Sequence, residues 1–234
     1  MRLLAIETAT PGSSVALAEG RETVAFAARV DRTGHSEFLV PAIDFCFDQA
    51  GWQPSDIDGI AVDVGPGLYT GIRVGLATAQ ALGATLGLPV IPVSSLDAVA
   101  LDAATGHRHI WAVIDVRRGE LAVCCYQPVP GGVVKDGPIE LVDLEGFRAR
   151  LDSDPNDALV VGDVAALGEE VLRGLHRVKT GRPPFPSARA VAEIAAGRLE
   201  RDEIPHPEEI RPLYLRDPDV TINWAKIRQP GPWG

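Results

Sequence analysis

Residues 64–75 read VGPGLYTGIRVG, a glycine-rich stretch between an expected strand and an expected helix. The strand is the apolar run 60–64, and the helix spans about residues 70–86. Glycine permits tight backbone turns, and the N-terminus of a helix favours an anion. No Gly-Lys-Ser/Thr follows, so the stretch is not a Walker phosphate loop. An ordinary strand-to-helix connection explains the same spacing, and this alternative stays open.

The helix after this loop carries a small residue at every fourth position, namely Gly71, Gly75, Ala79, Gly83 and Gly87. Each interior glycine destabilises a helix by roughly 1 kcal/mol relative to alanine, so a close approach of another backbone must offset this loss. That backbone belongs either to the protein's own sheet or to a second subunit. We predict a partner interface at Gly71, Gly75, Ala79 and Gly83, with internal packing as the open alternative.

The apolar runs on either side of this helix predict three strands, a helix and two further strand–helix units, in that order. The pattern then restarts. A strand ending on an acid, a glycine turn and a second strand occur over residues 3–18 and again over residues 110–126. This repeat predicts an α/β fold with two duplicated lobes, residues 1–105 and 106–216, followed by a C-terminal tail, residues 217–234.

Composition limits the kinds of protein that this chain can be. Hydrophobic residues make up 46% of the 234 residues, and the formal net charge is −10. An acidic chain of this size lacks the positive surface needed to grip a nucleic-acid backbone by itself. The N-terminal apolar run reaches Glu7 too soon for a signal peptide or a membrane span. With only three cysteines and no CxxC spacing, we expect a reduced, cytoplasmic protein with no membrane association.

A second candidate site is the turn from Glu7 to Ser14, ETATPGSS, whose hydroxyls and backbone amides could cradle a phosphate. An ordinary hairpin turn is the alternative. A carboxylate at a strand end could bind Mg²⁺, but Glu7 by itself is weak evidence. The candidate residues for nucleotide or anion binding are Thr8, Gly12, Ser13, Gly65, Gly67, Thr70 and Arg73.

Metal ligands and nucleophiles do not stand out in the sequence. His107 and His109 alternate along an extended stretch, but without a third ligand nearby we expect them to be surface residues. Cys124 and Cys125 lie in an apolar strand, where a structural role is expected. We therefore predict no catalytic residue and no metal site.

Two segments resemble the hallmark motifs of the TsaB (YeaZ) family: residues 4–10, LAIETAT, and residues 65–75. Residues 114–120, IDVRRGE, and 212–216, PLYLR, are further matches, and together these segments span most of the chain in the expected order. The family-motif residues to which we assign no role are Glu7, Asp115, Arg117, Glu120, Tyr214 and Arg216.

The resemblance implies the actin/Hsp70/sugar-kinase fold, in which two ribonuclease-H-like lobes each hold a mixed sheet flanked by helices. It also implies a role in making threonylcarbamoyladenosine beside the anticodon of tRNAs that read codons starting with A. In that system TsaC makes threonylcarbamoyl-adenylate, TsaD transfers the group to tRNA, and TsaE is an ATPase. TsaB is the non-catalytic scaffold that pairs with TsaD and TsaE and forms a homodimer when alone.

The same resemblance implies that the chain has no cofactor of its own, that ATP or ADP could bind at the TsaD interface, and that tRNA is met only through the complex. The metal-bearing relative TsaD carries a His-x-x-x-His pair, and Ser95 and Val99 stand at those positions here. Neither side chain can replace imidazole at a transition metal. The paired-glycine adenosine signature of the fold is reduced to residues 161–163, VGD. Both losses favour the scaffold, and an ATP-dependent phosphotransferase of the same fold is the alternative.

Two departures from the TsaB pattern are also present. Glu7 occupies a position that aspartate usually holds, and residues 217–223 are inserted before Trp224. We expect these changes to affect nucleotide contacts and docking of the tail rather than the fold.

Overall fold

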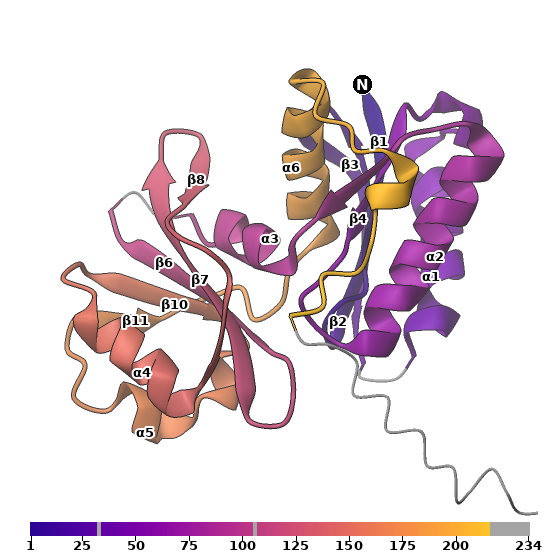
Figure 1. Ribbon diagram of the computed structural model, residues 1–234. Helices are drawn as coiled ribbons and strands as arrows, with labels where there is room; N and C mark the ends of the chain where they lie inside the picture. The colour runs from indigo at the N-terminus through magenta and orange to yellow at the C-terminus, as the bar shows by residue number, and fades with distance from the viewer. Residues whose placement is uncertain (32–33, 105–106, 216–234) are drawn as a thin grey trace, which may run out of the picture.

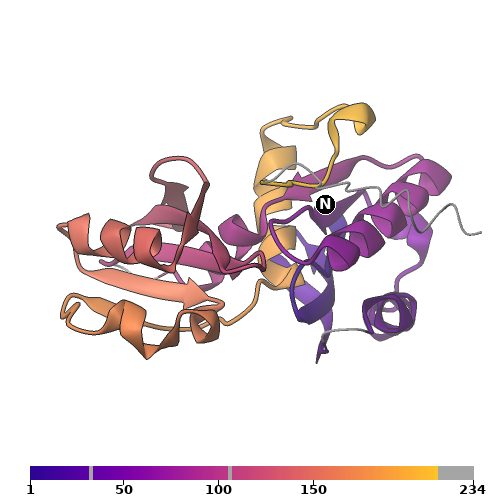
Figure 2. The ribbon, with the colours of Figure 1, turned by 60° about the horizontal axis from the view of Figure 1, so that its bottom comes forward.

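The computed structural model describes residues 1–31, 34–104 and 107–215, and shows two lobes side by side, each built on one mixed sheet (Figure 1). The predicted tail and Arg216 lie outside the described residues. Turning the molecule shows that the lobes meet near two helices, α3 (Ser95–Asp102) and α6 (Ala188–Glu200) (Figure 2). None of the helices in the described ranges combines the length and the apolar character needed to cross a bilayer.

The first lobe has a five-stranded sheet in the order β3-β2-β1-β4-β5. Its strands are β1 (Arg2–Glu7), β2 (Gly12–Glu19), β3 (Glu22–Val30), β4 (Gly59–Asp63) and β5 (Val90–Val93). Two helices cover one face of this sheet, α1 (His35–Ala50) and α2 (Tyr69–Leu86). The glycine-rich stretch therefore connects β4 to α2, as the sequence predicts.

The second lobe has a six-stranded sheet in the order β11-β10-β6-β7-β8, with β9 also pairing with β7. Its strands are β6 (His109–Asp115), β7 (Glu120–Val129), β8 (Gly132–Lys135), β9 (Glu140–Asp143), β10 (Ala158–Gly162) and β11 (Val178–Thr180). Two helices cover one face, α4 (Leu144–Ser153) and α5 (Gly168–Leu172). The short strands β8 and β11 were not predicted, because three or four residues are too few to show an alternating pattern.

The two sheets repeat one topology. In the first, β1 lies at the centre, antiparallel to β2 and parallel to β4, and β4 is parallel to β5. In the second, β6 occupies the same place relative to β7, β10 and β11. The structure thus confirms the predicted duplication and the two-lobed α/β class.

The chain crosses between the lobes twice, which corrects the predicted lobe boundaries. Helix α6 was assigned to the second lobe, yet its alanines pack on the face of the first sheet opposite α1 and α2. Helix α3, assigned to the first lobe, contributes Leu96, Val99 and Ala100 to the core of the second. The small side chains of α6 explain its position, because its alanines let the helix backbone lie close to Ala5, Ala16 and other small residues of the first sheet.

Residues 207–215 also return to the first lobe. Ile210 is buried in its core, and the backbone N–H of Leu213 donates to the carbonyl oxygen of Val64 at 2.8 Å. Residues 187–214 therefore belong with the first lobe, beside the glycine-rich loop, and not with the second lobe as predicted, whereas Leu215 packs against the core of the second lobe.

Candidate functional site

The two segments that the sequence singled out pack directly against each other. The backbone N–H of Leu68 donates to the carbonyl oxygen of Ala9 at 2.6 Å, and the Thr8 hydroxyl donates to the carbonyl oxygen of Gly71 at 2.8 Å. A Cβ added at Gly67 would overlap the Ala9 carbonyl, and one added at Gly71 would overlap the Thr8 carbonyl. Glycine is required at both positions because two backbones touch there.

The small-residue stripe of α2 is internal, which corrects the predicted partner interface. Gly71, Gly75, Ala79 and Gly83 are all buried. A Cβ at Gly75 would overlap the Thr8 hydroxyl, and one at Gly83 would crowd Val90. The close approach that offsets the helix-destabilising glycines is therefore to the protein's own β1–β2 turn and β5, and these four residues are not available to a partner.

The predicted phosphate cradle is closed in this structure. Thr8, Gly12, Ser13 and Gly65 are buried. The Thr8 hydroxyl is bonded to Gly71, and Ser13 Oγ lies 2.6 Å from His35 Nδ1. The side chain of Phe185 lies against Gly12. The turn therefore offers a phosphate neither of these hydroxyls, and among the seven candidate residues only Thr70 and Arg73 are exposed.

Two buried carboxyl groups lie side by side beneath this turn, at the ends of the neighbouring parallel strands β1 and β4. Glu7 Oε1 accepts hydrogen bonds from the N–H groups of Ala9 and Thr10 at 2.9 and 3.3 Å. Asp63 Oδ1 accepts from the Ser95 hydroxyl at 2.6 Å and from the Gly65 N–H at 2.7 Å. Within the described residues, Glu7 Oε2 and Asp63 Oδ2 have no hydrogen-bond partner.

Burial dominates the titration of this pair. It raises the pKa of Asp63 to about 7, against the opposing hydrogen bonds from Ser95 and Gly65. Burial, together with the neighbouring charge of Asp63, raises the pKa of Glu7 well above its ordinary value. Two enclosed carboxylates cannot both ionise at low cost, so the pair retains a proton near neutrality. Glu7 and Asp63 therefore shape the turn and the loop through these hydrogen bonds.

The family-motif residues of the second lobe build the turn between β6 and β7. Arg117, Arg118 and Gly119 are consecutive residues with φ of 72°, 60° and 76°. Asp115 Oδ1 accepts the Arg117 N–H at 2.8 Å, and Asp163 Oδ2 accepts the Asp115 N–H at 3.0 Å. Glu120 begins β7 directly after this turn. Asp115 and Arg117 thus have a local structural role, which holds two non-glycine residues in the left-handed region.

An exposed aromatic and basic group lies at the start of α2, where the returning C-terminal segment meets it. The rings of Tyr69 and Tyr214 stack with centroids 5.5 Å apart. The Arg73 guanidinium lies 3.9 Å from the centre of the Tyr69 ring, and its Nε donates to the Tyr214 hydroxyl at 2.9 Å. The tyrosines also line a cavity of about 150 Å³ with Val116 and Leu141 of the second lobe.

We call the exposed side of the α1–α2 layer the outer face; its α2 part is poor in charge, whereas its α1 part carries Glu37, Asp44 and Asp48. Helix α2 has 18 residues and a single charged one, Arg73. In α1, Val40 is 60% exposed and Phe45 is 50% exposed. The exposed residues of α2 are Tyr69, Thr70, Arg73, Ala77, Gln80, Ala81, Ala84 and Thr85. A solvated helix normally carries charges on its exposed side, so this surface has the composition of an interface.

The predicted interface residues form the buried side of α2, whereas its exposed side begins two residues earlier, at Tyr69. The near absence of charge along the whole helix is a further sequence signal that the prediction did not use. The stacking of Tyr214 on Tyr69 had no sequence signal, because 145 positions separate the two residues.

Comparison with known proteins agrees with this architecture. The family model for TsaD, tRNA N6-adenosine threonylcarbamoyltransferase, matches residues 26–134. The chain is 30% identical to the tRNA threonylcarbamoyladenosine biosynthesis protein TsaB of Escherichia coli, over 97% of this chain and 98% of that protein. The structure of YeaZ from Pseudomonas aeruginosa superposes with a TM-score of 0.79 at 27% identity, covering 91% of this chain and all of YeaZ.

A more distant structure extends the comparison to the fold class. An activator of 2-hydroxyisocaproyl-CoA dehydratase from Clostridium difficile, solved with bound ADPNP, has a TM-score of 0.50 at 11% identity, covering 88% of this chain and 99% of the activator. The duplicated sheets and their flanking helices place the protein in the actin/Hsp70/sugar-kinase fold class. Within that class, the chain belongs to the TsaB (YeaZ) family.

The substitution Gly71→Ala tests the contact between the two backbones. We expect it to lower the free energy of unfolding by about 1–3 kcal/mol or more, because the new methyl overlaps a carbonyl oxygen that no rotamer change can move. The control is Gly197→Ala in α6, where the nearest atom to an added Cβ is the flexible end of Arg201, 3.4 Å away. That variant should be neutral or stabilised by up to about 1 kcal/mol in urea unfolding. Equal stability of the two variants would contradict the contact.

The buried carboxyl pair predicts a stability that falls as pH rises. Asp63 has a raised pKa in the folded protein, about 7, against an ordinary value of about 4 in the unfolded chain. The folded state therefore holds more protons between these values, and stability declines from about pH 4 to pH 7. Asp63→Asn keeps an acceptor for Ser95 and has no proton to lose, so its urea midpoint should fall less from pH 5 to pH 8.

His35 acts in the opposite direction, because burial lowers its pKa, but it is present in both proteins and cancels in the comparison. Asp48→Asn on the exposed side of α1 serves as the control and should follow the wild-type profile. Parallel profiles for the wild type and Asp63→Asn would show that Asp63 does not titrate as described.

Proposed function

We propose that this chain is a non-catalytic docking subunit in the biosynthesis of threonylcarbamoyladenosine in tRNA, the process named for its E. coli relative. The observation that carries the proposal is the outer face, where α2 exposes a single charged residue, Arg73, and α1 exposes Val40 and Phe45 beside Glu37, Asp44 and Asp48. Because α2 has few charges to desolvate, burying its exposed side against a partner carries a small electrostatic penalty.

The partner that fits is TsaD, a relative of the same fold class whose family model matches part of this chain. In this arrangement TsaD carries the transfer site and TsaE supplies ATPase activity. The chain pairs with itself through the same outer face when TsaD is absent. Since its net charge is −10, it meets tRNA only through the complex. If ATP or ADP binds at the TsaD interface, Thr70 and Arg73 are the exposed candidates on this chain.

The interior of the first lobe supports a non-catalytic role over a phosphotransferase. Ser95, at the first of the two positions where TsaD carries histidine, is fully buried and bonded to Asp63. Val99, at the second, is a core residue of the second lobe. The turn that would hold phosphate is closed by backbone contacts with α2.

The decisive experiment is threonylcarbamoyl transfer to tRNA by purified TsaD and TsaE supplied with threonylcarbamoyl-adenylate, with and without this chain. We expect transfer only when the chain is added and none from the chain alone. The same preparation should show no magnesium-dependent ATP turnover. Transfer or ATP turnover by the chain alone would overturn the non-catalytic role and favour the phosphotransferase.

The outer face is tested by placing a charge at its centre. Ala81→Glu in α2 should weaken binding to TsaD, and self-association, at least about tenfold, because an unpaired carboxylate would be buried in the interface. Its urea stability should stay within about 0.5 kcal/mol of the wild type, since the position is exposed. Binding is measured by calorimetry, and self-association by sedimentation.

Ala104→Glu is the matched control, because it makes the same change at an exposed position after α3, away from α1 and α2. It should bind TsaD like the wild type. If Ala81→Glu also bound TsaD with undiminished affinity, α2 would not be the docking surface.

A further inference from the structure

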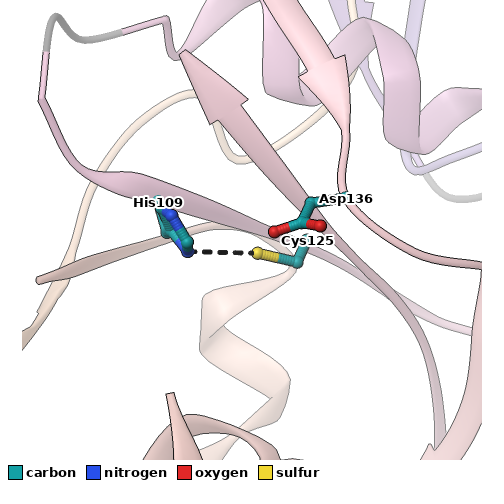
Figure 3. A group of neighbouring side chains, drawn as sticks. All are labelled: His109, Cys125 and Asp136. Carbon is teal, nitrogen blue, oxygen red and sulfur yellow. Dashed lines mark hydrogen bonds between the residues drawn. The ribbon is translucent and has the colours of Figure 1, made fainter. Parts of the chain in front are cut away.

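Three potential metal ligands converge in the second lobe, far from the outer face. His109 begins β6, Cys125 lies in β7 opposite Trp111, and Asp136 directly follows β8. Figure 3 shows their side chains turned toward one another from these separate strands. A ring nitrogen, the thiol sulfur and a carboxylate oxygen all lie within 4.8 Å of one another. Sequence reasoning treated His109 as a surface residue and Cys125 as structural, so this meeting was not foreseen.

A fourth oxygen belongs to Asp154, at the end of α4. Its Oδ2 lies 3.3 Å from His109 Nδ1 and accepts the Trp111 indole N–H at 2.9 Å. Its Oδ1 accepts two hydrogen bonds from Asn156, at 3.0 and 3.1 Å. Burial raises the pKa of Asp154, but these hydrogen bonds outweigh it, and the pKa lies below its ordinary value. Asp154 is therefore a carboxyl group held rigidly by three hydrogen bonds.

The arrangement is unsuited to nucleophilic catalysis. Cys125 Sγ lies 3.8 Å from His109 Nδ1, the same nitrogen that faces Asp154. A cysteine–histidine–acid relay needs the thiol and the acid on opposite ring nitrogens. Burial also raises the pKa of the Cys125 thiol to about 12, whereas a reactive cysteine needs a lowered one.

We propose that His109, Cys125, Asp136 and Asp154 form a binding site for a zinc-class divalent ion. Thiolate, imidazole and carboxylate are the ligands that Zn²⁺ takes in proteins. Tetrahedral zinc geometry places nitrogen and oxygen ligands about 3.3 Å apart, and sulfur and nitrogen ligands about 3.5 Å apart. The observed separations, 3.3 Å for Asp154 and 3.8 Å for Cys125 from His109 Nδ1, match this geometry closely. Asp136 is exposed, has a carboxylate oxygen within 4.8 Å of the His109 and Cys125 ligand atoms, and accepts a hydrogen bond from Gln127 at 2.9 Å.

When the ion binds, it takes the place of the proton on the Cys125 thiol. The thiol proton of Cys125 leaves for solvent, neutral His109 binds the ion through Nδ1 with its ring proton on Nε2, and no bond is oxidised or reduced. The positive ion then stabilises the thiolate that burial and the neighbouring Asp154 and Asp136 disfavour in its absence. The bound ion would join the start of β6, the middle of β7, the end of β8 and the end of α4, and so would stabilise the second lobe.

The test uses the full chain, stripped with a chelator and titrated with Co²⁺ as a spectroscopic substitute for zinc. We expect saturation at one equivalent, a thiolate-to-cobalt charge-transfer band and the strong visible absorption of tetrahedral cobalt. Zn²⁺ should displace the cobalt and Mg²⁺ should not, because thiolate and imidazole favour the softer ion. Zn²⁺ should also raise the midpoint of thermal unfolding.

Neighbouring cysteines give a matched pair of variants. Cys125→Ser should abolish the charge-transfer band and weaken binding more than about 100-fold, since even outer-shell changes weaken metal sites about 10–100-fold. Cys124→Ser should bind like the wild type, because Cys124 lies on the opposite face of the sheet, in the core around α3. His109→Gln, at a partly exposed strand start, should reproduce the loss if Cys125→Ser fails to fold.

Three results would overturn the site. One is the absence of a saturable equivalent of Co²⁺ or Zn²⁺ in the folded wild type. The second is a cobalt charge-transfer spectrum that is unchanged in both Cys125→Ser and His109→Gln. The third is a spectrum that is lost in Cys124→Ser. None of these results bears on docking to TsaD, which the outer face of the first lobe governs.

Discussion

The backbone of the β1–β2 turn touches the backbone at the start of α2, and this contact determines how α2 lies on the first sheet. Gly67 and Gly71 allow the carbonyl groups of Ala9 and Thr8 to approach where any side chain would collide. This contact sets the rotation of α2 about its own axis. Once the helix is rotated in this way, its small-residue stripe must face β1, and the side on which Arg73 is the single charge must face outward.

The packing of the β1–β2 turn also bears on nucleotide binding. The fold occurs in a dehydratase activator solved with ADPNP, so the architecture itself is compatible with nucleotide. In this chain the β1–β2 turn packs against α2, and Glu7 Oε1 accepts hydrogen bonds from the N–H groups of Ala9 and Thr10. A lobe whose β1–β2 turn is used for internal packing, and whose helix α2 exposes a single charge, fits the docking role that we propose.

The lobes are held together by the exchange of helices. Helix α3 packs on the second sheet although it follows β5 of the first, and α6 packs on the first sheet although it follows β11 of the second. Each lobe therefore depends on the other for one layer of its core. The exchange also brings Tyr214 back to Tyr69, so that the end of the described chain completes the edge of the outer face.

Local pattern made most of the fold predictable. Alternating and helical spacing of apolar residues predicted the long strands, the helices and the duplicated order, because each pattern reflects burial of one element's own surface. The two motif segments, residues 4–10 and 65–75, were sufficient to indicate the family. The short strands β8 and β11 were missed because three or four residues carry no measurable period.

The amino-acid sequence by itself determined the elements, their order and the need for close backbone contact along α2. Only the tertiary structure decided that this contact is internal, that α6 lies on the first sheet, and that His109 meets Cys125. The reason is physical. Periodicity records which side of an element is buried, but the identity of the surface that covers it depends on the packing of residues distant in the chain.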